Sequence, residues 1–368
     1  MTIQEICEQF YINGTYVECK ELTTGNINAT YLVGFVRDGE DKKYILQRIN
    51  TNVFREPEKV MDNIVRVTEY IRNNVREEGL STRKFVMRAF LSKKDMRPYV
   101  IDDMGGYWRC YRYIVNSETY DSCDDLEVIE RVGGAFGRFQ NFLDGFDASS
   151  LHVSIPDFHN TIKRYETFEK IVSKNEFDRV KYCKKEIEDV LSFKEEACLL
   201  QKYLDQGKIP LRVTHNDTKS NNVSFDKDTK EALAVLDLDT VMPGAIAFDF
   251  GDAIRFIANT VIEDNPNIKD VALDIDKYKA FTKGFVGEVN SKLEEMERET
   301  LNLGVFAMTV ELAVRFLGDY IDGDRYFKIK HPGHNMDRAR NQIALAKDII
   351  KKREQMQEIF NDICKGQV

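Results

Sequence analysis

Hydrophobic and polar positions change their spacing along this chain of 368 residues. Between Glu21 and Asn50, short apolar runs alternate with polar turns, and Asp38–Gly39 is a hairpin turn signal. From Asn52 to Asn74, apolar residues recur every three or four positions, as on one face of a helix. Further strands are predicted at 85–91, 97–102 and 107–115. We therefore expect an N-terminal antiparallel sheet of roughly five strands with one long helix.

The rest of the chain has a mainly helical pattern. Residues 124–206 are amphipathic, and Gly133, Gly134 and Gly137 allow a helix there to pack closely. Four more helices are expected at 249–260, 277–289, 297–321 and 335–360. We predict an α+β protein with a small β-rich lobe over 1–112 and a larger helical lobe over 113–368. Every apolar run falls short of the ~18 residues of a membrane span.

A dense polar segment, residues 211–252, interrupts the helical half. An apolar run ending at Val213 leads into the polar loop 215–222, and a second run, Ala232–Leu236, stops at Asp237. His-x-Asp-x-x-x-x-Asn followed by a strand that ends in Asp is typical of phosphotransfer sites. Asp and Asn residues in a loop sometimes have no role beyond forming a turn. The complete pattern in one hairpin nevertheless favours a phosphotransfer site.

This pattern predicts a role for five polar residues of the segment. Asp217 is the predicted catalytic carboxylate, which holds the attacking hydroxyl. Asn222 and Asp237 are the predicted Mg²⁺ ligands, because Mg²⁺ takes oxygen donors and few protein carboxylates. Asp239 is either an additional ligand or a turn former. We expect His215 to brace the loop by hydrogen bonds rather than to act as an acid or base.

The N-terminal half offers three candidates for nucleotide binding. The turn with Gly25 and Asn26 is a candidate cover for ATP phosphates, and an ordinary hairpin is the alternative. Arg48 in YILQRI is the candidate cation, with a solvated strand residue as the alternative. A strand alternates its faces, so only one of Gln47 and Arg48 faces the cleft. The predicted connector, which includes Tyr113, offers backbone groups to an adenine edge.

Composition limits the partners. The net charge of −9 and the isoelectric point near 5.3 argue against nucleic acid or an anionic membrane as the main partner. The seven cysteines are scattered without C-x-x-C spacing, which favours reduced thiols. The sequence begins without a recognisable secretory signal. We therefore expect a cytoplasmic location.

Several motifs together resemble those of known enzymes. The pattern THND…NN…VLDLD…PG…DFGDAIR resembles the aminoglycoside phosphotransferase-like enzymes, which share the bilobal fold of protein kinases. The longer segment THNDTKSNNVSFDKDTKEALAVLDLDTVMPGAIAFDFGDAIRFIANT is similar to that of bacterial N-acetylhexosamine 1-kinases. So are YILQRINTNVF (44–54), GRFQ (137–140) and RFLGDYIDGDRYFK (315–328). This resemblance implies ATP- and Mg²⁺-dependent phosphorylation of the anomeric hydroxyl of N-acetylglucosamine or N-acetylgalactosamine.

The resemblance also implies roles for residues. It implies that Asp217 is the catalytic carboxylate and contacts the substrate. It also implies that Arg315 and Tyr326 line the sugar pocket. Residue type alone favours structural roles: an ion pair at the end of a helix for Arg315, and a ring at the edge of the hydrophobic core for Tyr326. Asp249 begins a D-F-G sequence but lies far beyond Asp217. It resembles the acidic residue that braces the catalytic loop, which leaves the metal role to Asp237.

Two alternatives stay open. The acceptor of a kinase could be another small alcohol: a different hexose, a choline-type amino alcohol or an aminoglycoside. The acidic segment DYIDGD would suit a cationic acceptor. The other alternative is an inactive kinase-like binding protein, which the intact Asp217, Asn222 and Asp237 disfavour.

Overall fold

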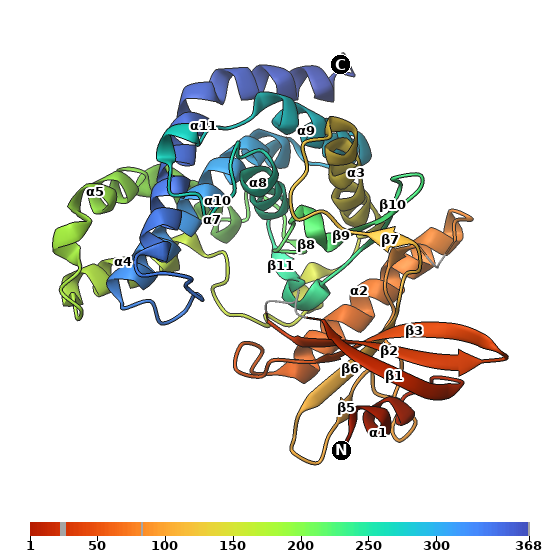
Figure 1. The fold of residues 1–368 in the computed structure, drawn as a ribbon. Coiled ribbons are helices and arrows are strands. Elements are labelled where there is room, and N and C mark those ends of the chain that lie inside the picture. The colour runs from red at the N-terminus through yellow and green to blue at the C-terminus, as the bar shows by residue number, and fades with distance from the viewer. Residues whose placement is uncertain (23–26, 82–83, 367–368) are drawn as a thin grey trace. The chain divides into compact units, whose positions relative to one another are not determined.

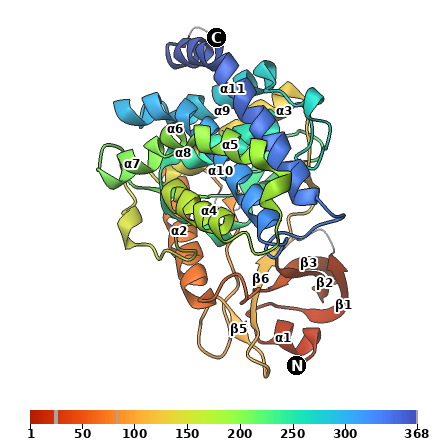
Figure 2. The same cartoon turned by 90° about the vertical axis from the view of Figure 1, so that its left-hand side faces the viewer.

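The computed structural model describes residues 1–22, 27–81 and 84–366, which form two compact units. The first unit contains Met1–Glu118, Ser150–Ile155 and Ser224–Met242, and the second contains Thr119–Ser149, Pro156–Val223 and Pro243–Val368. Sheets dominate the N-terminal region and helices the C-terminal region (Figures 1 and 2). The α+β class is therefore confirmed. The predicted lobe boundary between residues 112 and 113 stays a prediction.

A five-stranded antiparallel sheet in the order β1-β2-β3-β6-β5 is the framework of the first unit. Its strands are β1 (Thr15–Leu22), β2 (Ala29–Arg37), β3 (Glu40–Arg48), β5 (Val100–Ile101) and β6 (Tyr107–Arg112). Alternate residues on one face, including Val33, Leu46 and Trp108, form a core with helix α1 (Ile3–Glu8). Apolar burial of this kind stabilises the sheet by roughly 25 cal/mol per Å² removed from water.

Helix α2 (Pro57–Glu77) has proline in its first turn and buries Val60, Ile64, Val67 and Ile71, as its periodicity predicts. The fully buried Asn63 amide donates to the carbonyl oxygens of His152 (2.8 Å) and Val241 (3.0 Å). These bonds attach α2 to both returning segments of the first unit. A neutral hydrogen bond contributes about 0.5–1.5 kcal/mol, but an unsatisfied buried partner costs more.

A second sheet has the order β4-β10-β9-β7. Its strands are β4 (Phe85–Val86), β7 (Ser117–Glu118), β9 (Val223–Asp226) and β10 (Ala232–Val235). The strand expected over 85–91 is therefore only two residues long, and it pairs in parallel with β10. Further along the expected segment, Ala89 forms an isolated antiparallel bridge with Tyr111 of β6. The expected strand is thus divided between the second sheet and a single bridge to the large sheet.

Helices build the second unit. Their bounds are α3 (Leu126–Phe142), α4 (Thr161–Lys174), α5 (Lys184–Ser192), α6 (Lys194–Ala197), α7 (Leu199–Asp205), α8 (Ile246–Ile257), α9 (Ile275–Val289), α10 (Glu295–Ile321) and α11 (His334–Cys364). Short strands β8 (Arg212–Thr214) and β11 (Met242–Gly244) accompany them, with 3-10 turns at Val180–Tyr182, Ser220–Asn222 and Ile268–Asp270. Two other 3-10 turns are Ala148–Ser150, at a change of unit along the chain, and Leu238–Thr240 in the first unit.

Helix α10 is the central core element of the second unit. It is long and apolar enough, by length and composition, to span a membrane, but 83% of its most apolar window is buried inside the structure. Helices α8, α11 and α4 pack against α10 and cover its apolar surface. No other helix in the described parts of the chain meets the same criterion.

Helices α3 and α9 cross at very short distance because glycines meet backbone. A Cβ at Gly133 would lie 2.2 Å from the carbonyl oxygen of Phe281, and one at Gly284 would lie 1.9 Å from that of Glu130. Both distances are far inside van der Waals contact. The close packing expected from Gly133 and Gly137 is therefore present, whereas a Cβ at Gly134 would meet only the carbonyl oxygen of Gly284 at 3.9 Å, an ordinary contact.

Asp264, in the loop after α8, anchors the start of α11. Its carboxylate accepts hydrogen bonds from Lys330 Nζ (2.7 Å) and Arg338 Nε (2.7 Å), and His334 Nε2 lies 3.1 Å away. Burial acts against ionisation, but the two hydrogen bonds and the nearby charges lower the pKa of Asp264 to about 2.

We predict opposite effects for two alanine substitutions in α9. Gly284→Ala places a methyl group against the backbone of α3 and should lower the free energy of unfolding by about 1–3 kcal/mol. Gly287→Ala, where nothing lies within 4 Å of the new Cβ, should raise it by about 0.5–1 kcal/mol through better helix propensity. Urea unfolding measures both. Equal changes in the two variants would contradict the close crossing.

Asp264 should make stability depend on pH in a defined direction. Its pKa is lower in the folded protein than in the unfolded chain, so its contribution is present above about pH 4 and is lost as pH falls toward 2. Lys330 is largely exposed, and we therefore expect Asp264→Asn to cost only about 1–2 kcal/mol at pH 7. Urea midpoints from pH 7 to pH 3 measure the effect. A difference between variant and parent that grows as pH falls would refute the assignment.

Candidate active site

The loop between β8 and β9 holds the conspicuous polar residues, and Asp249 of α8 organises its backbone. Asp249 Oδ2 accepts from the N–H of His215 (2.8 Å) and from Gln140 Nε2 (2.8 Å), while Oδ1 accepts from the N–H of Asn216 (2.8 Å). Complete burial raises the pKa of Asp249, although these donors act against the shift. The first residue of D-F-G thus has a buried side-chain carboxylate that accepts hydrogen bonds from the backbone of the loop, within the second unit.

Two histidines hold the peptide group that precedes Asp217. The N–H of Asp217 points at His215 Nδ1 (3.3 Å), and the carbonyl oxygen of Asn216 lies 3.3 Å from His159 Nε2. Asn216 itself has φ 64°, a left-handed conformation that asparagine tolerates better than most residues. Both sides of this peptide are therefore fixed by buried side chains.

The Asp217 carboxylate has two neighbours from its own loop. Lys219 Nζ lies 2.8 Å from Oδ1, and Asn222 Nδ2 donates to Oδ2 (3.0 Å) and to the Asp217 carbonyl oxygen (2.8 Å). Asp217 is about 30% exposed, which leaves its carboxylate accessible to a small molecule.

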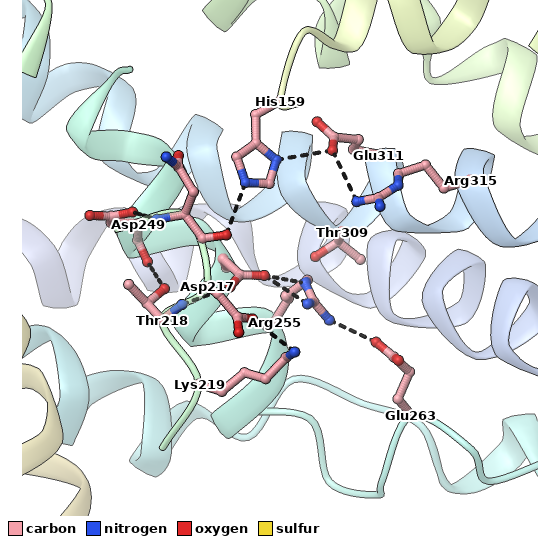
Figure 3. Close-up of polar contacts among 12 residues, drawn as sticks. His159, Asp217, Thr218, Lys219, Asp249, Arg255, Glu263, Thr309, Glu311 and Arg315 are labelled. Carbon is pink, nitrogen blue, oxygen red and sulfur yellow. Dashed lines mark hydrogen bonds and ion pairs between the residues drawn. The ribbon is translucent and has the colours of Figure 1, made fainter. Parts of the chain in front are cut away.

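A chain of buried charges continues from the loop into α8, as Figure 3 shows. Asp252 accepts from the N–H of Thr218 (3.0 Å) and from Arg255 Nε (2.9 Å), and Arg255 Nη1 reaches Glu263 (2.8 Å). Although burial acts against it, the charges of Arg255 and Lys219 lower the pKa of Asp252. Buried charges of this kind are tolerated only as hydrogen-bonded pairs.

Arg315 and Tyr326, the residues predicted for a sugar pocket, lie together in the second unit. The Arg315 guanidinium carbon lies 5.6, 5.9 and 5.5 Å from the ring centres of Phe158, Tyr326 and Phe327. Asp319 holds the neighbouring loop by accepting from the N–H groups of Tyr326 (2.8 Å) and Phe327 (3.0 Å). Tyr326 is 68% exposed, so its ring is accessible to a ligand.

Asp237 and Asp239 belong to the first unit. Asp237 follows β10 and has φ 54°, and Asp239 is buried in the next turn. Arg109 of β6, only 2% exposed, pairs with Asp239, which also accepts from Asn28 Nδ2 (2.6 Å). The Arg109 pair attaches the turn that carries Asp237 to the large sheet.

The predicted nucleotide residues are placed as follows. Gln47 shares a sheet face with Arg109, and their side chains hydrogen bond (3.0 Å). Arg48 lies on the opposite face beside Trp108 (5.9 Å to the ring centre), so the structure does not bring it together with Asp237. Tyr113 donates its N–H to the carbonyl oxygen of Lys43 (3.1 Å), which leaves that N–H unavailable to an adenine. Gly25 and Asn26 lie outside the described residues.

Asn222 and Asp237 belong to different units, and each carries an oxygen donor of a kind that Mg²⁺ binds. Both contacts of Asn222 Nδ2 are to oxygen atoms that only accept, so the amide oxygen faces away from Asp217. Asp237 contributes an exposed carboxylate. An amide oxygen and a carboxylate are ligands that Mg²⁺ accepts, with phosphates and water completing its shell. Within the described ranges, no cluster of three or more His, Cys, Asp or Glu forms a metal site of another kind.

Sequence reasoning missed three residues that the structure brings to these sites. Lys219 contacts Asp217, and its position two residues further along the loop was an available signal. Arg109 and His159 gave no such signal, because they come from segments distant in sequence from Asp239 and Asn216. Only the fold brings these pairs together.

Comparisons with known proteins agree with this geometry. The model of the phosphotransferase enzyme family matches residues 18–277. An aminoglycoside phosphotransferase from Alicyclobacillus acidocaldarius subsp. acidocaldarius is similar in structure, with 13% identity, a TM-score of 0.65 and coverage of 97% of each chain. Choline kinase from Cryptosporidium parvum Iowa II gives 13% identity and a TM-score of 0.60 over 97% of this chain and 96% of that one.

A third structure, a microcompartment-associated aminopropanol kinase, is 15% identical, with a TM-score of 0.58 over 95% of this chain and 97% of that one. At these identities the structural likeness establishes the fold, which is that of the kinase-like phosphotransferases. The family model covers well over half of the chain. The protein therefore belongs to the phosphotransferase enzyme family.

Proposed function

We propose that the protein transfers the γ-phosphoryl group of ATP to the anomeric hydroxyl of an N-acetylhexosamine, either N-acetylglucosamine or N-acetylgalactosamine, in the cytoplasm. Family membership makes it a phosphotransferase that acts on alcohol acceptors. The hexosamine acceptor, ATP as donor and Mg²⁺ are the proposed details. They are supported by the motifs around Asp217 and by the surroundings of Arg315.

The surroundings of Arg315 are the observation that favours a neutral acceptor. Sites that bind cationic alcohols typically place aromatic faces around the positive nitrogen. Here the three rings of Phe158, Tyr326 and Phe327 already have a cation beside them, the Arg315 guanidinium. Arg164 adds a second positive charge close to Arg315. A cationic acceptor would be repelled, whereas hydroxyl and acetamido oxygens can accept hydrogen bonds from a guanidinium.

The acidic segment that could have favoured a cationic acceptor is already engaged. Asp319 accepts hydrogen bonds from the N–H groups of Tyr326 and Phe327 and from Asn335 Nδ2 (2.9 Å). Asp324 pairs with Arg179 (2.5 Å) and accepts from Asn335 (2.9 Å). These contacts weaken the case for choline-type alcohols or aminoglycosides, which remain the second candidate because the similar structures include a choline kinase and an aminoglycoside phosphotransferase.

In the proposed mechanism, Asp217 accepts a hydrogen bond from the acceptor hydroxyl, directs its oxygen toward the γ-phosphorus and takes its proton late in the transfer. The positive charge of Lys219, next to Asp217, offsets the negative charge of the carboxylate when phosphate groups come close. Asn222 and Asp237 would hold Mg²⁺, which when bound neutralises charge on the phosphates. Phosphoryl transfer has a loose transition state, so positioning and charge neutralisation supply most of the acceleration.

An acceptor panel tests the proposal. We expect Mg·ATP-dependent ADP release with N-acetylglucosamine or N-acetylgalactosamine to exceed that with glucose, galactose, choline and kanamycin by at least about tenfold in kcat/KM, a difference of ~1.4 kcal/mol in transition-state binding. Phosphorus–proton NMR should place the product phosphate on C1. A C6 phosphate, or a preference for choline or kanamycin, would overturn the proposed acceptor. No ADP release with any acceptor would favour an inactive binding protein.

Asp217→Asn should remove nearly all turnover, because general-base contributions are typically ~10²–10⁴-fold and the hydroxyl would also lose its orientation. ATP affinity, measured by calorimetry, should stay within about threefold, a change of under ~1 kcal/mol. Asp228→Asn, in the exposed turn of the same hairpin, is the matched control and should keep parental activity. Near-normal turnover of Asp217→Asn would exclude its catalytic role.

A further inference from the structure

His159 lies outside the polar motifs but is buried against the loop that carries Asp217. Its ring lies between Phe158 (4.5 Å between ring centres) and Phe248 of α8 (5.5 Å). Its Nε2 lies 3.3 Å from the carbonyl oxygen of Asn216, and its Nδ1 lies 3.0 Å from Glu311 Oε1 on α10. Both ring nitrogens therefore face oxygen atoms inside the second unit (Figure 3).

Proton counting restricts the state of this group. A carbonyl oxygen only accepts, so Nε2 must carry hydrogen to bond to Asn216. A second hydrogen must lie between Nδ1 and the Glu311 carboxylate for that contact to be a hydrogen bond. The pair is then either an imidazolium with a carboxylate or a neutral imidazole with a carboxylic acid.

The charges around the pair favour the ionic form. Arg315 Nη1 lies 3.7 Å from Glu311, and Arg164 is a further cation close by. Although burial acts in the opposite direction, His159, Arg315 and Arg164 lower the pKa of Glu311. On the side of α8, the Asp252 carboxylate is close enough to interact with His159.

Glu311 connects two functional elements. It lies one helical turn before Arg315 on α10, so a single carboxylate contacts both the arginine proposed to bind the acceptor and the histidine that holds the catalytic loop. Glu311 is fully buried and its Oε2 has no hydrogen-bond partner among the described residues. The carboxylate therefore depends on His159 and Arg315 for compensation of its charge.

We propose that His159 is a positioning residue which, as an imidazolium, couples acceptor binding at Arg315 to the orientation of Asp217. Its bond to Asn216 fixes the peptide that precedes Asp217 and so affects kcat. Its bond to Glu311 fixes the carboxylate beside Arg315 and so affects the KM for the acceptor. The second effect rests on the proposed role of Arg315, whereas the first requires only that Asp217 is catalytic.

Two substitutions separate the two bonds. In His159→Gln the amide nitrogen falls near the position of Nε2, and in His159→Asn near that of Nδ1. We expect His159→Gln to keep kcat within about threefold and to raise the acceptor KM about tenfold. His159→Asn should keep the acceptor KM and lower kcat by up to ~10²-fold, as small misplacements do. The acceptor is whichever alcohol the parent enzyme phosphorylates with the highest kcat/KM, so this test does not depend on the hexosamine assignment.

Two controls distinguish positioning from folding. His331→Asn, in the exposed loop before α11, should keep parental kcat and acceptor KM. The ATP KM should change little in both His159 variants, and kcat is calculated per folded enzyme because the loss of a buried bond lowers the thermal midpoint. Identical kinetic profiles for His159→Gln and His159→Asn, or losses that follow the fraction of unfolded protein, would overturn the proposal.

Nitrogen-15 NMR of the imidazoles tests the charge state without any acceptor. The chain has five histidines, so single variants assign the His159 signals. We expect both ring nitrogens of His159 to be protonated at pH 7.5 in the parent and only one in Glu311→Gln. A neutral His159 in the parent would overturn the imidazolium while leaving the proposed phosphotransfer intact.

Discussion

The buried carboxylate of Asp249 is the constraint on which the candidate active site depends. A polar loop inside a helical unit has backbone N–H groups that must be satisfied away from water. Asp249 accepts two of them, from His215 and Asn216, and Asp252 accepts a third from Thr218. Because these acceptors lie on the rigid helix α8, the loop has a defined conformation instead of the mobility usual for loops.

Fixing the backbone leaves the Asp217 side chain exposed to solvent and paired with Lys219. This division of roles explains the density of polar residues in the segment. His215, Asp249 and Asp252 bond to the backbone of the loop, while Asp217 and Asn222 carry the oxygen atoms for which we propose chemical roles. Preorganised groups of this kind need little rearrangement during reaction.

The sequence predicted the α+β class and the phosphotransferase family, because helical and strand periodicities and the motif at 215–222 are local features. It also proposed different roles for Asp249 and Asp237, since the apolar strand before Asp237 is visible in the pattern, and the metal role of Asp237 stays a prediction. It could not predict that Gln47 rather than Arg48 shares a face with Arg109, because that depends on strand register. His159 and Glu311 were likewise invisible, because residues 152 positions apart meet only after folding.

Amide hydrogen exchange over residues 214–218 tests the central claim, that buried carboxylates hold the catalytic loop rigid. The amides of His215, Asn216 and Thr218 should exchange as slowly as those in the core of α10, because opening them requires breaking bonds to buried acceptors. The amides of Asp228 and Thr229 provide the reference, because they also donate to a carboxylate, that of Asp226 (2.9 and 3.0 Å), but lie in an exposed turn. Exchange of the three loop amides at the rate of that turn would contradict the account.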